Sequence, residues 1–156
     1  MAAIEARLAE LGIELPDVAP PVAAYVPAVV TGSYVYTSGQ LPFAAGALPA
    51  TGKVGDASGL VSADDAKGYA RTAALNALAA VRAELGSLDR VTRIVKLVGF
   101  VASDPAFTGQ PGVINGASEL LGEVFGEAGR HARSAVGVAV LPLDSPVELE
   151  LVVEFA

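Results

Sequence analysis

Residues 131–155 read HARSAVGVAVLPLDSPVELELVVEF and predict two β-strands, one at about 134–141 and one at about 147–155. In the second strand every odd-numbered position is apolar, and glutamates stand at three of the even-numbered positions, the pattern of a strand with one buried face. Arg133 stands at the start of the first strand and Glu148 near the start of the second. A guanidinium is a permanently charged fork that fits a carboxylate, and a glutamate can orient or activate water. These two residues therefore indicate a site for a small organic acid.

The rest of the chain predicts alternating strands and helices. We expect a leading helix at about 2–11, strands at 25–30 and 34–38, a long helix at 63–85, a strand at 91–101 and a helix at 112–125. Ser62 and Asp65 form a capping box for the long helix, and Gly86 can end it. The order β-β-α-β-α-β-β after the leading helix predicts an α+β fold, a mixed sheet with two main helices packed on one face.

The length of 156 residues predicts a single domain over 1–156, with an N-terminal helix and connector at 1–19 and a core at 20–156. Two helices cover only one face of a sheet, and the chain is apolar, with a mean hydropathy of +0.52. Because a bare apolar sheet face is a liability for a monomer, we expect copies of the same chain to cover it.

Composition narrows the possible functions. The chain has no cysteine and one histidine, which excludes thiolate chemistry and a multi-histidine metal site within one chain; we expect no metal and no cofactor. The net charge of −7 repels phosphate backbones, so no nucleic-acid partner is expected. No apolar run nears the ~20 residues that span a bilayer, and the charged N-terminus is no signal peptide. We therefore expect a cytoplasmic protein without membrane contact.

Four blocks of the sequence resemble the RidA/YjgF family, also called the Rid or endoribonuclease-like family. They are Tyr25, Ser38-Gly39-Gln40-Leu41-Pro42, Asn115, and Ala132-Arg133-Ser134 with Leu141-Pro142 and Val147-Glu148-Leu149-Glu150. The likeness covers about 20–156. It implies a chorismate-mutase-like fold in a homotrimer whose sheets face the trimer centre, with ligand pockets between subunits. It also implies cofactor-free hydrolysis of small enamine or imine acids, such as 2-aminoacrylate, to 2-keto acids and ammonia.

The resemblance also implies roles for individual residues. By motif position these are a carboxylate-binding arginine at Arg133, a water-positioning glutamate at Glu148, a pocket serine and glycine at Ser38 and Gly39, a pocket tyrosine at Tyr25, a pocket position at Asn115 and a backbone contact at Ala135. The chain departs from the family where Val26-Pro27 replaces a usual Ser-Gln and where His131 stands at a position commonly held by proline.

Each candidate also has an ordinary structural interpretation. Serine and glycine favour turns, and a tyrosine is commonly a half-buried ring with a wet hydroxyl. Asparagine and glutamate are mostly exposed, and an arginine at a strand end is most often solvated or ion-paired.

A register argument separates the two principal candidates. If the strands at 134–141 and 147–155 form a hairpin that turns near 144–145, Glu148 lies opposite about Val140 and Arg133 opposite about Phe155. Seven residues at ~3.3 Å each then separate the two positions by roughly 23 Å. One small ligand cannot span that distance, so the two side chains would have to come from different subunits.

Three functions follow as hypotheses. The first is an enamine/imine deaminase that needs no cofactor. The second is a non-enzymatic trimer that binds a small carboxylate metabolite as a sensor or regulator, using the same arginine. The third is an endoribonuclease, against which the pI of about 4.6 and the single histidine argue.

Overall fold

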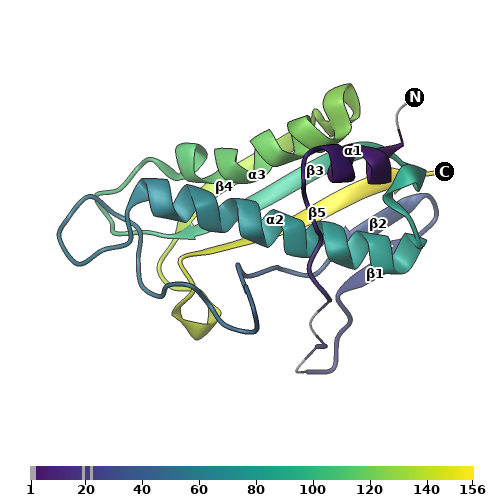
Figure 1. Cartoon of the computed structure of the whole chain (residues 1–156). Coiled ribbons are helices and arrows are strands. Elements are labelled where there is room, and N and C mark those ends of the chain that lie inside the picture. Colours follow the sequence, from purple (N-terminus) through teal and green to yellow (C-terminus); the bar gives the residue numbers. More distant parts are fainter. Residues whose placement is uncertain (1–2, 19, 22) are drawn as a thin grey trace.

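The structure is a computed structural model that describes residues 3–18, 20–21 and 23–156 (Figure 1). Its main elements are α1 (Ile4–Glu10), β1 (Ala28–Thr31), β2 (Tyr34–Thr37), α2 (Ala63–Leu85), β3 (Val91–Ala102), α3 (Gln110–Phe125), β4 (Ala132–Val138) and β5 (Val147–Phe155). Three short 3₁₀ turns, η1 (Leu88–Arg90), η2 (Gly126–Gly129) and η3 (Pro142–Asp144), join them. The order of elements is the predicted one.

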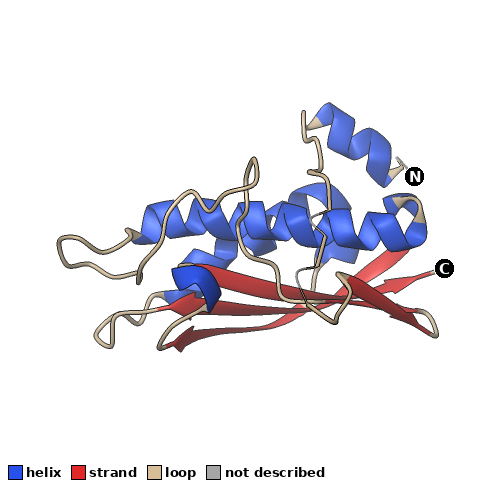
Figure 2. Cartoon of the chain, turned by 90° about the horizontal axis from the view of Figure 1, so that it is seen from below, coloured by secondary structure: helices blue, strands red, loops and turns tan. Residues whose placement is uncertain are grey.

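The strands form one sheet in the order β1-β2-β5-β3-β4. The β3–β4 pair is parallel and the other pairs are antiparallel, so the sheet is mixed. Both long helices lie on the same face of this sheet (Figure 2). The predicted α+β arrangement of two main helices on one face is confirmed. None of the described helices is both long and apolar enough to cross a bilayer.

Local signals set the ends of α2. The Ser62 hydroxyl accepts a hydrogen bond from the backbone N–H of Asp65 at 3.1 Å, which satisfies one free N–H of the first turn. At the other end Gly86 adopts a left-handed conformation with φ of 80°, as a glycine after a helix commonly does. The end at Gly86 agrees with the sequence prediction, and of the predicted capping box the Ser62 half is present, whereas no bond from the Ser62 N–H to the Asp65 side chain is found in the described part of the chain. Between them, a run of buried alanines lets the helix lie close to the sheet.

The expected hairpin between the last two strands is wrong. In the structure β3 lies between β4 and β5, pairing with β4 in parallel and with β5 antiparallel. The reason is that α3 connects the end of β3 to the start of β4. Parallel neighbours need such a crossover helix, whereas a hairpin joins antiparallel ones. The strand expected at 134–141 also ends earlier, at Val138, and η3 occupies part of the segment before β5.

The sheet face away from the helices combines an apolar patch with charged side chains. The register of the strands places on it the apolar or aromatic residues Val29, Tyr36, Val98, Phe100, Val136 and Val152, together with Lys96, Ser134, Glu148, Glu150 and Glu154. Tyr36 is 47% exposed and Val136 is 45% exposed, and no described segment packs over this face (Figure 2). Its cover by further copies of the chain therefore stays a prediction.

A close approach between the two long helices sets the position of α3. A Cβ added at Gly116 of α3 would collide with the backbone carbonyl oxygen of Lys67 in α2 and would lie 2.9 Å from the carbonyl carbon. Backbone cannot move aside as a side-chain tip can. Glycine at 116 therefore lets α3 settle against α2 and sets where its neighbour, Asn115, lies.

We expect Gly116→Ala to lower the free energy of unfolding by about 1–3 kcal/mol, because the added methyl group overpacks a helix contact. The matched control is Gly122→Ala in the same helix, where a Cβ would meet nothing within 4 Å; it should raise the free energy by about 0.5–1 kcal/mol. Urea unfolding of the two variants measures the difference. Equal stability of both variants would contradict the proposed close approach.

Candidate functional site

Arg133 extends from β4 onto the helix-covered face of the sheet. It pairs in register with the buried Leu97, and residues directly opposite on neighbouring strands share a face. Its Nη1 donates hydrogen bonds to Asn115 Oδ1 at 2.8 Å and to Ser118 Oγ at 3.1 Å. Its Nη2 donates to the carbonyl oxygen of Pro111 at 3.2 Å. The guanidinium is therefore held along one side of α3 by three oxygen acceptors.

These contacts leave part of the guanidinium available. An arginine has five N–H donors, and three of them are used by Asn115, Ser118 and Pro111. The Nε–H and one Nη2–H remain without a protein acceptor among the described residues. Nε and Nη2 form one edge of the planar group, and a carboxylate can bind an edge of this kind through two parallel hydrogen bonds. We call Arg133, Asn115, Ser118 and Pro111 the arginine half-site.

Glu148 lies on the opposite face of the sheet. The odd-numbered residues of β5 are buried under the helices, and Glu148 alternates with them. Its carboxylate rests against Gly39, because a Cβ built on Gly39 would collide with Glu148 Oε1 and lie 2.9 Å from its Cδ. Burial, and secondarily repulsion from the neighbouring Glu150, raise the pKa of Glu148 above its ordinary value by disfavouring the charged form.

The predicted residues Ser38 and Gly39 lie in the segment that contacts Glu148, and Ser38 links this segment to the residue after Tyr25. The backbone N–H of Gln40 donates to the carbonyl oxygen of Leu149 at 2.7 Å, which ties the segment after β2 to β5. Ser38 Oγ donates a hydrogen bond to the carbonyl oxygen of Val26 at 2.6 Å. Because the hydroxyl proton is already used, the Ser38 oxygen can only accept a hydrogen bond from a ligand. Tyr25, which precedes Val26, is 51% exposed. We call Glu148, Gly39, Ser38 and Tyr25 the glutamate half-site.

The two half-sites do not meet within one protomer. Arg133 lies opposite Leu97 of β3, whereas Glu148 lies opposite Phe100, three rows further along. Three residues of ~3.3 Å and two strand spacings of ~4.8 Å place their Cα atoms roughly 14 Å apart. This separation is shorter than the one expected from a hairpin. The side chains nevertheless point to opposite faces of the sheet, so one small ligand cannot touch both.

Ala135 and the C-terminal end of β4 follow the arginine half-site along the strand. Ala135 pairs with Gly99 in the register of β4 and β3 and follows Arg133 on the same face. Further along, Ser103, Phe107, Gln110 and Gly137 line an open cavity of about 270 Å³. This cavity belongs to the same edge of the sheet as the arginine half-site.

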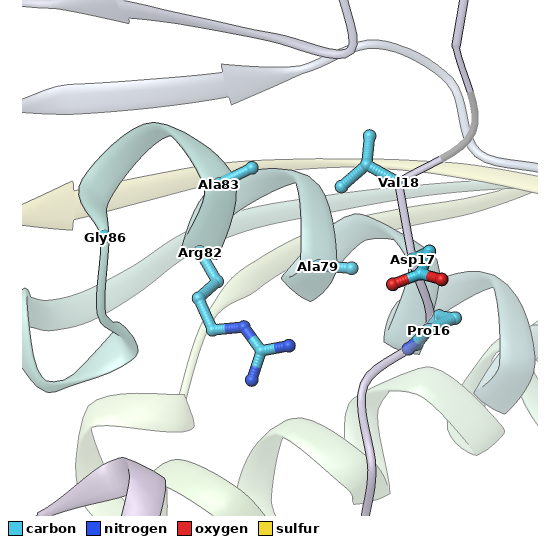
Figure 3. A pocket seen from close by; sticks show the side chains of 7 residues that line it. All are labelled: Pro16, Asp17, Val18, Ala79, Arg82, Ala83 and Gly86. Atoms are coloured by element: carbon cyan, nitrogen blue, oxygen red, sulfur yellow. The ribbon is translucent and has the colours of Figure 1, made fainter.

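A larger open cavity, of about 370 Å³, is lined by none of the predicted site residues. It is lined by Pro16, Asp17 and Val18 of the N-terminal connector and by Ala79, Arg82, Ala83 and Gly86 of the α2 end (Figure 3). The cation in its lining, Arg82, is paired with Glu5 at 3.5 Å, so this cavity offers a small acid less free positive charge than Arg133 does. No group of three or more His, Cys, Asp or Glu side chains among the described residues is placed to hold a metal ion.

Sequence reasoning did not identify two acceptors of the arginine half-site. Ser118 and the carbonyl of Pro111 both bind Arg133 directly. Their spacing from Asn115 held a usable signal, because positions 111, 115 and 118 follow the i, i+4, i+7 pattern of one helix face. The contact between Gly39 and Glu148 had no local signal, since it joins residues more than a hundred positions apart.

Comparison with known proteins places this geometry in a family. The model of the family described as "YjgF/chorismate_mutase-like, putative endoribonuclease" matches residues 5–156. The chain belongs to this family. The structures of family members share its α+β fold, so the predicted chorismate-mutase-like architecture is confirmed.

Three similar proteins illustrate the range of the family. "Protein TCP17" of Trypanosoma cruzi is 45% identical over 97% of this chain and 93% of its own. A "putative endoribonuclease" from Shewanella oneidensis is 36% identical, with a TM-score of 0.92 over 98% of this chain and 99% of that one. TdcF of E. coli, solved with bound serine, is 26% identical, with a TM-score of 0.66 over 89% and 94% of the two chains.

The packing of Glu148 against Gly39 yields a test. We expect Gly39→Ala to push the Glu148 carboxylate aside and to lower the free energy of unfolding by about 1 kcal/mol, because a flexible side-chain tip can yield to the added methyl group. In a Glu148→Ala background the same change should cost nothing. Thermal unfolding of the four proteins of this double-mutant cycle measures the coupling. Equal costs of Gly39→Ala in the two backgrounds would show that the side chains do not interact.

Proposed function

We propose that this protein hydrolyses small enamine or imine acids, of the 2-aminoacrylate type, to 2-keto acids and ammonia. We place the site between subunits of a homotrimer whose sheets face its centre. The observation that carries the proposal is the guanidinium of Arg133, which α3 holds by three hydrogen bonds while the Nε–H and one Nη2–H stay available. A guanidinium held in this way is prepared to bind the carboxylate that such substrates share.

The chemistry needs two further groups. An enamine acid first takes up a proton at carbon and releases one from nitrogen to solvent, which gives the imine. The imine nitrogen takes up a proton from solvent, the water oxygen forms a bond to the imine carbon, and the Glu148 carboxylate accepts a proton from that water. The protonated Glu148 then gives its proton to the amino group of the resulting carbinolamine, the C–N bond breaks to release ammonia, and the hydroxyl proton returns to solvent as the C=O bond forms. Because an imine is already electrophilic, positioning of water and substrate can supply much of the rate gain.

The sharing of the site between subunits rests on two observations. Arg133 and Glu148 point to opposite faces of their own sheet, so joint action requires a second protomer. The bare apolar face around Tyr36 and Val136 supplies a surface on which that protomer can pack. Ala135, Gly39 and Tyr25 would then line the cleft. We expect this trimer to work in the cytoplasm, in keeping with a chain free of cysteine.

A binding protein without turnover is the second candidate. E. coli TdcF was solved with bound serine, a small molecule that carries a carboxylate, and binding of that kind needs only the arginine half-site. The two candidates differ at Glu148. Glu148→Gln keeps the size of the side chain but removes the base, so it should abolish turnover and leave binding of a 2-keto acid nearly intact.

An endoribonuclease is the third candidate, named in the descriptions of the family and of the Shewanella oneidensis relative. The net charge of −7 opposes binding of a phosphate backbone. The single histidine is hydrogen-bonded to Ser118 and to the backbone of Gly129. Cleavage of RNA that persists in Arg133→Ala protein, free of contaminating nuclease, would favour this activity over the one we propose.

Ammonia release tests the proposed reaction. With 2-aminoacrylate generated in situ, we expect Arg133→Ala to lower kcat/KM by at least about 100-fold, because two charge-assisted hydrogen bonds of about 1.5–3 kcal/mol each are lost. Arg133→Lys is the matched control, since it keeps the charge without the fork, and it should also be impaired. Wild-type release no faster than that of Arg133→Ala, across a panel of 2-imino acids, would leave the binding protein as the better account.

Mixing two inactive variants tests the shared site. Arg133→Ala and Glu148→Gln subunits, unfolded together and refolded into mixed trimers, should regain roughly a quarter of wild-type activity. The reason is that one interface in four then pairs an intact arginine with an intact glutamate across a head-to-tail contact. Subunits refolded separately and then mixed are the control and should stay inactive. No recovery in the mixed trimers would mean that Arg133 and Glu148 do not act together across an interface, and the shared site would be wrong.

The raised pKa of Glu148 predicts the pH dependence. A general base acts only when deprotonated, so kcat should fall as the pH drops through this pKa. The acid limb should therefore lie above about pH 4.3, the ordinary value for a glutamate. Glu150→Gln removes the like charge that contributes to the shift and should move the limb to lower pH. If the acid limb does not move in this variant, the limb belongs to another titrating group.

A further inference from the structure

The single histidine of the chain is hydrogen-bonded to the arginine half-site, although the proposed chemistry does not use it. His131 Nε2 lies 2.9 Å from Ser118 Oγ, and Arg133 Nη1 donates to the same oxygen at 3.1 Å. The other ring nitrogen, Nδ1, lies 2.6 Å from the carbonyl oxygen of Gly129. Four groups thus form one continuous chain of hydrogen bonds from β4, through α3, to η2.

The direction of each hydrogen bond in this chain follows from the donors and acceptors present. A carbonyl oxygen can only accept, so His131 Nδ1 must carry a proton. The neutral ring then has its lone pair on Nε2, and the single hydroxyl proton of Ser118 is donated to it. The Ser118 oxygen consequently turns its lone pairs away from the ring and toward the Nη1–H of Arg133.

We propose that His131 is a positioning residue that orients Arg133 through the hydroxyl of Ser118; the role rests on the proposed binding of carboxylates by Arg133. A serine within a helix has another option, because its hydroxyl can donate to the carbonyl four residues earlier. With His131 as acceptor, the hydroxyl is fixed in the orientation that serves the guanidinium. Pre-organisation of this kind keeps a binding group in its productive geometry.

No carboxylate replaces Ser118 in this role. The acids of α3 and η2 are paired with other cations, Glu119 with Lys67 at 3.1 Å, Glu123 with Arg71 at 3.0 Å and Glu127 with Arg130 at 3.4 Å. The oxygens that hold Arg133 are therefore all neutral, from Asn115, Ser118 and Pro111. Because no anion within the arginine half-site neutralises the guanidinium, its full charge stays available to a ligand, and its orientation depends on neutral hydrogen bonds alone.

The tautomer of His131 is the first test, and it needs no ligand. Because the chain has one histidine, ¹⁵N-labelled protein should show a single pair of ring nitrogen signals. At about pH 8, where an ordinary histidine is neutral, we expect the proton on Nδ1, and we expect Ser118→Ala to shift the Nε2 signal as that nitrogen loses its donor. A proton on Nε2 in the wild-type protein would overturn the proposal, since the Ser118 hydroxyl could not then donate to the ring.

The second test measures carboxylate binding in a Glu148→Gln background, where no turnover occurs. We expect His131→Phe and Ser118→Ala each to weaken binding of 2-oxobutanoate by about 3- to 10-fold, the value of one neutral hydrogen bond. The double variant should bind no worse than either single one, because both changes interrupt the same chain. His131→Gln is the conservative control, since its amide oxygen can still accept from Ser118, and it should retain most of the affinity.

The outcomes separate this inference from the proposed function. If 2-oxo acids bind and the two losses add, or if His131→Phe binds normally, the positioning role is wrong and the function stands. If no 2-oxo acid binds to any form, the proposed function fails, and with it the positioning role that rests on it, even where the tautomer agrees. If His131→Phe does not fold, Ser118→Ala and the ring signals still decide the question. Calorimetry gives the affinities, and thermal unfolding checks that each variant is folded.

Discussion

The alternation of side chains along β4 and β5 is the constraint on which the candidate site depends. Because β3 separates these strands and pairs with both, their residues are held in a known register. Arg133 shares a row with Leu97 under the helices, and Glu148 shares a row with Phe100 on the bare face. A shift of one residue in either pairing would move a side chain to the other face. The buried odd positions of β5 oppose such a shift, since it would expose Leu149 and Leu151 to water.

Helix α3 fixes the orientation of the Arg133 side chain that the register of β4 places beneath it. The helix follows β3 and precedes β4 in the chain, so it is both the crossover that makes β4 parallel and the surface against which Arg133 lies. Its position depends on glycines at two contacts. A Cβ on Gly99 of β3 would lie 2.5 Å from the Ile114 side chain, and a Cβ on Gly116 would meet the backbone of α2. Fold and site are therefore stabilised by the same close packing.

Most of the fold could be predicted from local patterns, whereas the arrangement of the site could not. The cap at Ser62, the glycine that ends α2 and the alternation in β5 are signals carried by a few adjacent residues, and the structure agrees with them. Whether β4 pairs with β5 or with β3 is not a local property, because both pairings bury the same apolar residues. The contact between Gly39 and Glu148 likewise depends on a long-range pairing, that of β2 and the segment after it with β5. Sequence motifs could therefore identify the two residues but could not predict that they touch.

The environment of Glu148 acquires a functional meaning in the proposed trimer. In one protomer the carboxyl group is partly buried beside Glu150, and its pKa is raised. A neighbour's arginine in the same cleft would favour the charged form of Glu148 and lower this pKa. A substrate carboxylate bound to that arginine would neutralise much of this charge, so the basicity of Glu148 would rise when substrate is present. Substrate binding would then raise the pKa of Glu148 through electrostatics alone. Release of the 2-keto acid product would return this pKa to its value in the empty site.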